Sequence, residues 1–256
     1  MELDWSDILP FLLTVTAMLL TCIRVQAQGS ATTDSSRKWE ITDNSFLVEE
    51  AFNQEAGVVQ NIFEWTLSRH GIWNGSFTQE WPAPGMKHQL SYSVPFASTG
   101  AATGIGDVLL NYRYQLREET AGGPAIAPRL SLILPSGSEA DGLGGGTTGL
   151  QFNLPLSKQF GNFYVHANAG YTWVPDVQRT TLVAGSVIWR VAPMLNVLLE
   201  GVGALNDSAT VSPGFRWGWN FGERQLVVGA AVPVTRADSR WSTALLTYLS
   251  YELPFR

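Results

Sequence analysis

The chain has 256 residues, of which 45% are hydrophobic, 11% are aromatic and only 15% are charged. This charged share is well below the roughly 25% of an average soluble domain, which disfavours a fold whose whole outer surface faces water. The formal net charge of −6 excludes the basic surface that nucleic-acid binding requires, and the single cysteine, Cys22, excludes a disulfide framework.

The first 27 residues have the pattern of a secretory signal peptide. Residues 8–23 form an uncharged apolar run, and Val25-Gln26-Ala27 follows as a small-residue cleavage site, so we expect cleavage after Ala27. The run is shorter than the roughly 20 residues that a transmembrane helix needs. The start departs from the usual pattern, because the seven residues before the run include three acids and no base. Export is the interpretation that the pattern favours.

Residues 28–57 form the expected N-terminal segment of the mature protein. Residues 28–43 are polar and rich in Ser and Thr, and we expect them to be disordered. Residues 44–57 show neither alternation nor a helical period. We hypothesise that they fold into the periplasmic mouth of a barrel as a plug, with Glu49, Glu50 and Glu55 meeting bases inside.

From residue 58 to residue 256, the dominant hydrophobic period is two, which predicts β-strands. In residues 162–173, for example, one row is apolar with aromatic ends, and the other row is polar or small. About twelve such segments occur, a count within the even-numbered range of outer-membrane barrels. The predicted strands are 58–69, 73–82, 86–96, 105–116, 125–135, 147–158, 162–173, 181–191, 194–203, 208–221, 225–234 and 241–255.

Ten charged residues within these predicted strands fall on the row opposite the more apolar one. A Lys or Arg facing lipid near the bilayer midplane costs about 2–4 kcal/mol, so a membrane barrel must turn such residues inward. We therefore expect these side chains to line the lumen, either to orient a solute or to form ion pairs that rigidify the interior. They are Glu64, Glu80, Lys87, Asp107, Arg113, Arg129, Arg190, Glu200, Arg216 and Glu252.

The amount of apolar surface separates a membrane barrel from a soluble β-sandwich. Twelve strands with one apolar row each present more surface than two small sheets can bury between them. Many rows end in Trp or Tyr, as in the aromatic girdles at membrane interfaces. Because an open sheet edge in lipid would leave backbone groups unpaired, the sheet must close. The fold class is therefore predicted as all-β, a closed antiparallel transmembrane β-barrel.

The connections alternate in length as in such barrels, with tight turns at 82–85, 192–193 and 222–223 and longer polar loops between them. Residues 117–124 and 70–72 depart from this regularity. The last strand alternates and ends in Phe255-Arg256, so we expect the outer-membrane assembly machinery to recognise it, although Arg256 follows the terminal aromatic.

Little in the sequence points to catalysis. The three histidines, His70, His88 and His166, have no metal-binding spacing, and no nucleophile motif or phosphate-binding loop occurs. The sequence therefore predicts no enzyme, no metal and no cofactor.

Three segments and a hairpin resemble one family of outer-membrane barrels. Residues 44–60 (NSFLVEEAFNQEAGVVQ), 104–114 (GIGDVLLNYRY), 128–137 (PRLSLILPSG) and 156–173 (LSKQFGNFYVHANAGYTW) are similar to the MetA-pathway of phenol degradation family, whose members are described as transporters. The resemblance covers most of residues 44–256. It implies a barrel related to channels for aromatic or other apolar molecules, and it brings no catalytic residues.

Two functional hypotheses follow from the sequence. The first is a passive outer-membrane channel for small molecules, with outer-membrane lipid, the assembly machinery and a small solute as partners. The second is a non-conducting outer-membrane barrel with a structural, adhesion or scaffold role. A soluble periplasmic β-protein and a membrane-embedded hydrolase have less support.

Overall fold

The computed structural model describes residues 40–41, 45–205 and 207–255 of the chain. The predicted signal peptide, the stretch 28–39 and the final Arg256 lie outside the described residues. Within the described part, no helix is long and apolar enough to cross a bilayer.

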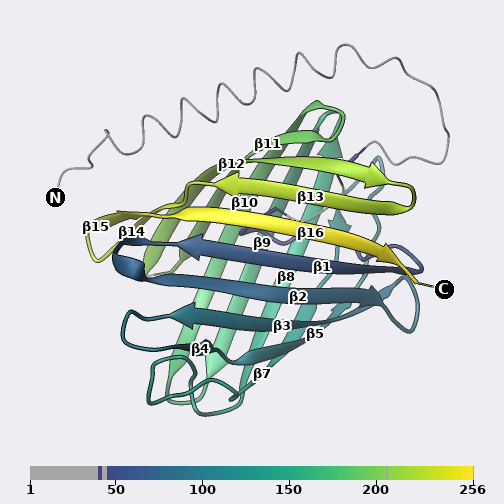
Figure 1. Cartoon of the computed structure of the whole chain (residues 1–256). Helices are drawn as coiled ribbons and strands as arrows, with labels where there is room; N and C mark the ends of the chain where they lie inside the picture. The colour runs from purple at the N-terminus through teal and green to yellow at the C-terminus, as the bar shows by residue number, and fades with distance from the viewer. Residues whose placement is uncertain (1–39, 42–44, 206, 256) are drawn as a thin grey trace. The chain divides into compact units, whose positions relative to one another are not determined.

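The described chain forms a closed, antiparallel barrel of twelve strands, as the sequence predicts. Consecutive strands pair around the barrel, and β16 closes it by pairing with both β13 and β1 (Figure 1). The first six wall strands are β1 (Val58–Leu67), β2 (Trp73–Pro82), β3 (His88–Ser98), β5 (Val108–Tyr114), β7 (Arg129–Leu134) and β8 (Gly149–Phe160). The next four are β9 (Phe163–Val174), β10 (Gln178–Ala192), β11 (Leu195–Ala204) and β12 (Ser208–Phe221).

The last two wall strands are each interrupted once. One consists of β13 (Arg224–Ala231) and β14 (Val234–Ala237), and the other of β15 (Arg240–Thr243) and β16 (Leu245–Pro254). The first interruption falls at Pro233, which has no N–H to donate to a ladder. The remaining elements are short: β4 (Thr103–Ile105) pairs with β3, β6 (Ala125–Ile126) pairs with β8, and a 3₁₀ turn spans Arg69–Gly71.

The predicted strands agree with the observed ones except near irregular connections. The bounds of β2 and β12 match the predictions 73–82 and 208–221. The predicted strand 105–116 is shorter, because Gly106 and Asp107 separate β4 from β5. The predicted strand 125–135 is divided into β6 and β7 at Ala127-Pro128, where proline again lacks a donor.

Each wall strand turns alternate side chains outward and inward. In β1, Phe63 and Trp65 are exposed, whereas Gln60 and Ile62 are buried. The same outward exposure of large apolar side chains recurs around the barrel, including Leu132 on β7, Val183 on β10 and Leu199 on β11. A continuous apolar outer surface of this kind is suited to lipid.

Aromatic side chains on the outer face pair across neighbouring strands. Trp65 and Trp73 stack with ring centroids 4.6 Å apart at one end of the β1–β2 pair, and Phe163 and Trp189 stack at 6.0 Å beside the β8–β9 turn. These pairs lie near opposite ends of the wall strands, the arrangement in which interfacial aromatics are found.

Replacement of Val183 by Arg tests which surface faces lipid. Val183 lies on the outward row of β10 and is 46% exposed. Because an arginine near the bilayer midplane must be desolvated or distort the lipid, we expect Val183→Arg to lower the free energy of unfolding in lipid vesicles by about 2–4 kcal/mol.

The matched control is Val177→Arg in the β9–β10 turn, where the side chain is 57% exposed and lies outside the wall strands. We expect it to change stability by less than about 1 kcal/mol, as near the interface. Urea unfolding in vesicles measures both variants. Equal losses for the two would contradict a lipid-facing row on β10.

Candidate functional site

The interior of the barrel is occupied by residues 45–57, called here the internal segment. Its backbone lacks a strand partner, so side chains on the inward rows of the wall satisfy its N–H groups. Glu200 on β11 accepts hydrogen bonds from the N–H groups of Leu47 and Val48 through one carboxylate oxygen, at 2.8 and 3.1 Å. Asn168 on β9 accepts from the N–H of Glu49 at 2.8 Å and donates to the Glu49 carbonyl at 2.7 Å.

The second half of the internal segment is held in the same way by the opposite part of the wall. The N–H groups of Asn53 and Gln54 donate to Gln115 and to Gln89 on β3, at 3.1 and 2.7 Å. Gln115 in turn donates to the carbonyl of Ala51 at 2.8 Å. The segment is therefore hydrogen-bonded to strands on several sides of the lumen.

The Glu49 carboxylate is the centre of the charged contacts. It pairs with Arg113 on β5 at 3.2 Å and with Arg129 on β7 at 2.9 Å, and it accepts a hydrogen bond from Asn153 on β8 at 2.7 Å. Burial by itself would raise the pKa of Glu49, but Arg129, Arg113 and the Asn153 hydrogen bond outweigh it and hold the pKa below its ordinary value of 4.5. One carboxylate thus neutralises part of the charge of two inward-facing arginines, of which Arg113 is buried and Arg129 borders a cavity.

Arg113 contacts the internal segment at further points. Its side chain is only 3% exposed, and it donates to the carbonyls of Glu50 and Phe52 and to the side chain of Asn53. It also reaches Gln89 on β3 at 2.9 Å. A guanidinium with five donors can satisfy this many acceptors, which lysine could not.

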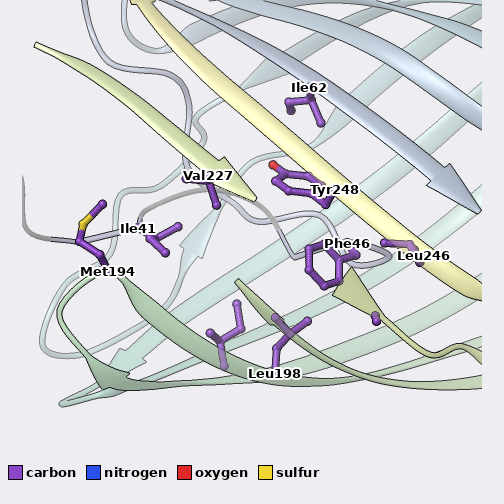
Figure 2. Packing of buried hydrophobic residues seen from close by; sticks show 10 residues of the cluster. Ile41, Phe46, Ile62, Met194, Leu198, Val227, Leu246 and Tyr248 are labelled. Carbon is purple, nitrogen blue, oxygen red and sulfur yellow. The ribbon is translucent and has the colours of Figure 1, made fainter. Parts of the chain in front are cut away.

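The internal segment also meets an apolar cluster inside the barrel. Phe46 packs 5.2 Å from Tyr248 on β16, within a buried cluster that also includes Ile41 (Figure 2). Gly229 on β13 makes room for the ring, since a Cβ there would lie 2.5 Å from the Phe46 side chain. The cluster draws on inward residues of several strands: Ile62, Ile188, Leu198, Val227, Leu246 and Tyr248.

Two cavities border the internal segment and share no lining residue. The larger, about 470 Å³, has Phe46 to Glu49 along one side and a wall rich in hydroxyl and amide groups, such as Thr78, Asn111 and Gln151. The smaller, about 280 Å³, has Glu50 to Glu55 on one side and reaches Tyr164 and His166. The segment thus separates one space from the other.

The structure places the ten predicted lumen residues in different surroundings. Glu64, Glu80 and Arg129 line the larger cavity, and Arg216 lines the smaller one. Arg113, Glu200 and Glu252 are buried. Arg190 forms an ion pair with Glu40 and donates to Asn162 at 3.2 Å.

Lys87 and Asp107 differ from the prediction. Lys87 is exposed and lies in the β2–β3 turn. The strand β3 begins at His88, whereas the predicted strand begins at residue 86 and therefore includes Lys87. Asp107 lies between β4 and β5, where its carboxylate accepts the N–H groups of Gly137 and Gly145 at 2.9 and 2.7 Å. It holds the 135–148 loop in place and lines neither cavity.

Sequence reasoning missed the contact between Ser157 and His166. The Ser157 oxygen lies 2.6 Å from Nδ1 of His166 and accepts the N–H of Ala51 at 2.7 Å. The signal was present in the sequence, since a two-residue turn at Gly161-Asn162 sets these residues opposite each other in the β8–β9 hairpin. Among the described residues, no group of three or more His, Cys, Asp or Glu side chains is placed to hold a metal ion.

Comparison with known proteins identifies the fold. No protein-family model matches the chain, and no curated protein matches it. Among solved structures, the chain is similar to an outer membrane channel from Pseudomonas putida F1, with a TM-score of 0.61 and 13% identity over 84% of this chain and 100% of the other. It also matches outer membrane phospholipase A from Escherichia coli, with a TM-score of 0.48 and 9% identity over 84% and 95% of the two chains.

The fold is that of outer-membrane β-barrel proteins. The similarity to the Pseudomonas channel extends over the whole of that protein, but the sequence identity is low. The similarity therefore identifies the barrel fold and does not identify a solute.

Replacing Glu49 by Gln tests how the internal segment is held. The substitution keeps the shape of the side chain but leaves Arg113 and Arg129 without their shared carboxylate. Breaking a buried ion pair by removing one partner costs about 3–5 kcal/mol. We expect hydrogen-exchange protection of the Leu47 and Val48 amides to fall about 100-fold, the equivalent of about 3 kcal/mol.

The control is Glu118→Gln, which removes an exposed acid beside the barrel mouth and leaves the lumen unchanged. In this control variant, the Leu47 and Val48 amides should exchange at the same rate as in the wild type. Protection that is unchanged in Glu49→Gln would show that the backbone hydrogen bonds alone hold the segment.

The lowered pKa of Glu49 also predicts a dependence on pH. An acid whose pKa is depressed by folding contributes its full stabilisation above its ordinary pKa and loses it as the pH falls through the lowered value. We expect the NMR signal of the Asn153 side-chain amide, which donates directly to the Glu49 carboxylate, to stay constant from pH 7 to about 4.5 and to shift only in more acidic solution. Glu49→Gln should lack this transition, and a wild-type transition centred above pH 5 would contradict the ion pairing.

Proposed function

We propose that this protein is an outer-membrane channel through which small molecules pass passively, and that the internal segment is a plug in its lumen. The observation that carries the proposal is a closed barrel whose interior holds solvent-sized space on both sides of a separately bound segment. A barrel of twelve strands is wider than the eight-stranded barrels that side chains alone can fill. The likeness to an outer membrane channel supports the same function.

The outer surface supports a location in the outer membrane. Large apolar side chains on the outward rows are 38–54% exposed at positions such as Leu132, Val183 and Leu199. In water, a protein with such a surface would associate or aggregate, whereas in a membrane the lipid chains contact the apolar side chains. Delivery there requires export, for which we propose the signal peptide at residues 1–27.

The lining of the larger cavity bears on the solute. Hydroxyl and amide groups cover much of it, while Phe46, Ile62 and Tyr248 provide an apolar side. This combination suits a small solute with both an apolar part and a hydrogen-bonding group. It accords with membership of the MetA-pathway of phenol degradation family, which we propose from the sequence motifs, and with aromatic molecules as candidate solutes.

A non-conducting barrel is the second candidate. It is favoured by the number of hydrogen bonds between the internal segment and the wall, and by the buried contacts of Phe46. A plug bound this firmly would rigidify the barrel, and a structural or scaffold role would follow.

We assign no catalytic role to Ser157 and His166. Ser157 is 1% exposed, and its oxygen already accepts the N–H of Ala51, so a substrate carbonyl could not approach it while the internal segment is in place. A nucleophile must lie within reach of its substrate before its pKa or its base matters. We infer that the pair fixes the segment to the β8–β9 hairpin.

Deletion of residues 29–57 tests the channel and its plug together. The deletion removes every contact described for the internal segment and leaves β1 intact. Because the lumen would then be a single wider space, we expect single-channel conductance in planar bilayers to rise severalfold. Liposome swelling with small solutes should become faster in parallel.

Deletion of residues 29–39 alone is the matched control, because it shortens the same end of the chain and keeps the internal segment. Its conductance should equal that of the wild type. Equal conductance for the two deletions would reject the plug, and the absence of any conductance or swelling in all three proteins would leave the non-conducting barrel.

A further inference from the structure

The inward charges of the barrel wall balance one another. Four acids face the interior from the wall strands, namely Glu64, Glu80, Glu200 and Glu252. Four bases face the same space, namely Arg113, Arg129, Arg190 and Arg216. One more pair, Glu119 with Lys158 at 3.0 Å, lies at the rim and cancels itself. The wall alone therefore gives the lumen no net formal charge among the described residues.

The chain preceding β1 changes this balance. It places four acids in the lumen, Glu40, Glu49, Glu50 and Glu55, and its described part includes no base. The interior of the described barrel consequently carries a formal charge of −4.

The surfaces of the two cavities show the same excess. Glu49, Glu64 and Glu80 line the larger cavity together with one base, Arg129. Four acids line the smaller cavity together with one base, Arg216, and two of the four, Glu40 and Glu119, form ion pairs with Arg190 and Lys158. Arg113, which offsets Glu49, is 3% exposed and lies behind the segment, so it contributes less to the potential that a solute meets.

We infer that the internal segment is the selectivity element of the channel: its carboxylates make the lumen prefer cations and uncharged solutes over anions. The inference rests on the proposed channel function and narrows its solute class. Rings and clusters of carboxylates favour cations in narrow pores, since a confined lumen with low-dielectric walls concentrates their field. Solutes that carry a carboxylate are disfavoured, and solutes with an ammonium group are favoured.

Removing the segment should abolish the preference for cations, because the wall that remains has no net formal charge among the described residues. Without Glu49, both Arg113 and Arg129 face the open lumen, and the wall has no other acid paired with them in the described contacts. The same deletion that widens the pore should therefore move its selectivity toward anions.

The reversal potential of the channel in a KCl gradient tests the inference. We expect the wild type to be cation-selective, with a K⁺ to Cl⁻ permeability ratio above one. The double variant Glu50→Gln/Glu55→Gln lowers the formal charge of the internal segment from −3 to −1 while the Glu50 carbonyl still accepts from Arg113. Its ratio should move toward one without the rise in conductance that follows deletion of residues 29–57, and the deletion should bring the ratio to one or below.

The matched control is Glu118→Gln/Glu223→Gln, which removes two exposed acids from connections outside both cavities. It should keep the wild-type ratio, and the differences should be largest at about 0.1 M salt or below, where screening is weakest. A wild-type ratio of one or less, or equal ratios for the two double variants, would overturn the inference and leave the channel function standing. A silent wild type beside a conducting deletion would also overturn it, because ions would then not pass a seated segment. Silence of every protein would overturn the channel function and the inference with it.

Discussion

One carboxylate shared by two inward-facing arginines is the interaction on which the interior of this barrel depends. Arg113 and Arg129 are direct neighbours on adjacent wall strands, so their like charges repel each other. Glu49 from the internal segment compensates both, and the geometry of the guanidinium groups then positions the carbonyls and amides that follow. Without the segment, these two arginines would lack their shared carboxylate, which explains why a polar stretch of chain is bound at this part of the wall.

The same segment meets both an apolar cluster and polar or charged side chains of the inner wall. Strands β3 to β9 turn amide, hydroxyl and guanidinium groups inward, whereas β1, β11, β13 and β16 contribute Ile62, Leu198, Val227 and Tyr248 to the apolar cluster. Phe46 packs in the apolar cluster, and Glu49 contacts the charged and amide side chains. The position of the segment is therefore fixed in rotation as well as in depth, as an amphipathic element would be against a core on one side and a polar network on the other.

The wall was predictable from sequence because alternation with period two is imposed by lipid on every strand. The interior of the barrel was less predictable from the sequence. Ile188, Leu198 and Tyr248 are inward and apolar, which the rule of a polar lumen does not anticipate, because their partner is a segment far away in the sequence. Lys87 and Asp107 were misplaced since each lies within two residues of a strand boundary, where turn geometry overrides alternation. The acids of residues 44–57 could be paired with lumen bases in principle, but the choice of Arg113 and Arg129 depends on barrel register.

The seam of the barrel has a consequence for the sequence of the internal segment. The wall closes where β1, the first strand after the internal segment, meets β16, the last strand of the chain. The segment contacts β5, β8, β9 and β11, so its interior position links strands that the chain forms long before β16 closes the wall. The sequence of this short stretch is therefore constrained by the strands that it must contact inside the barrel as well as by the β1–β16 seam that directly follows it.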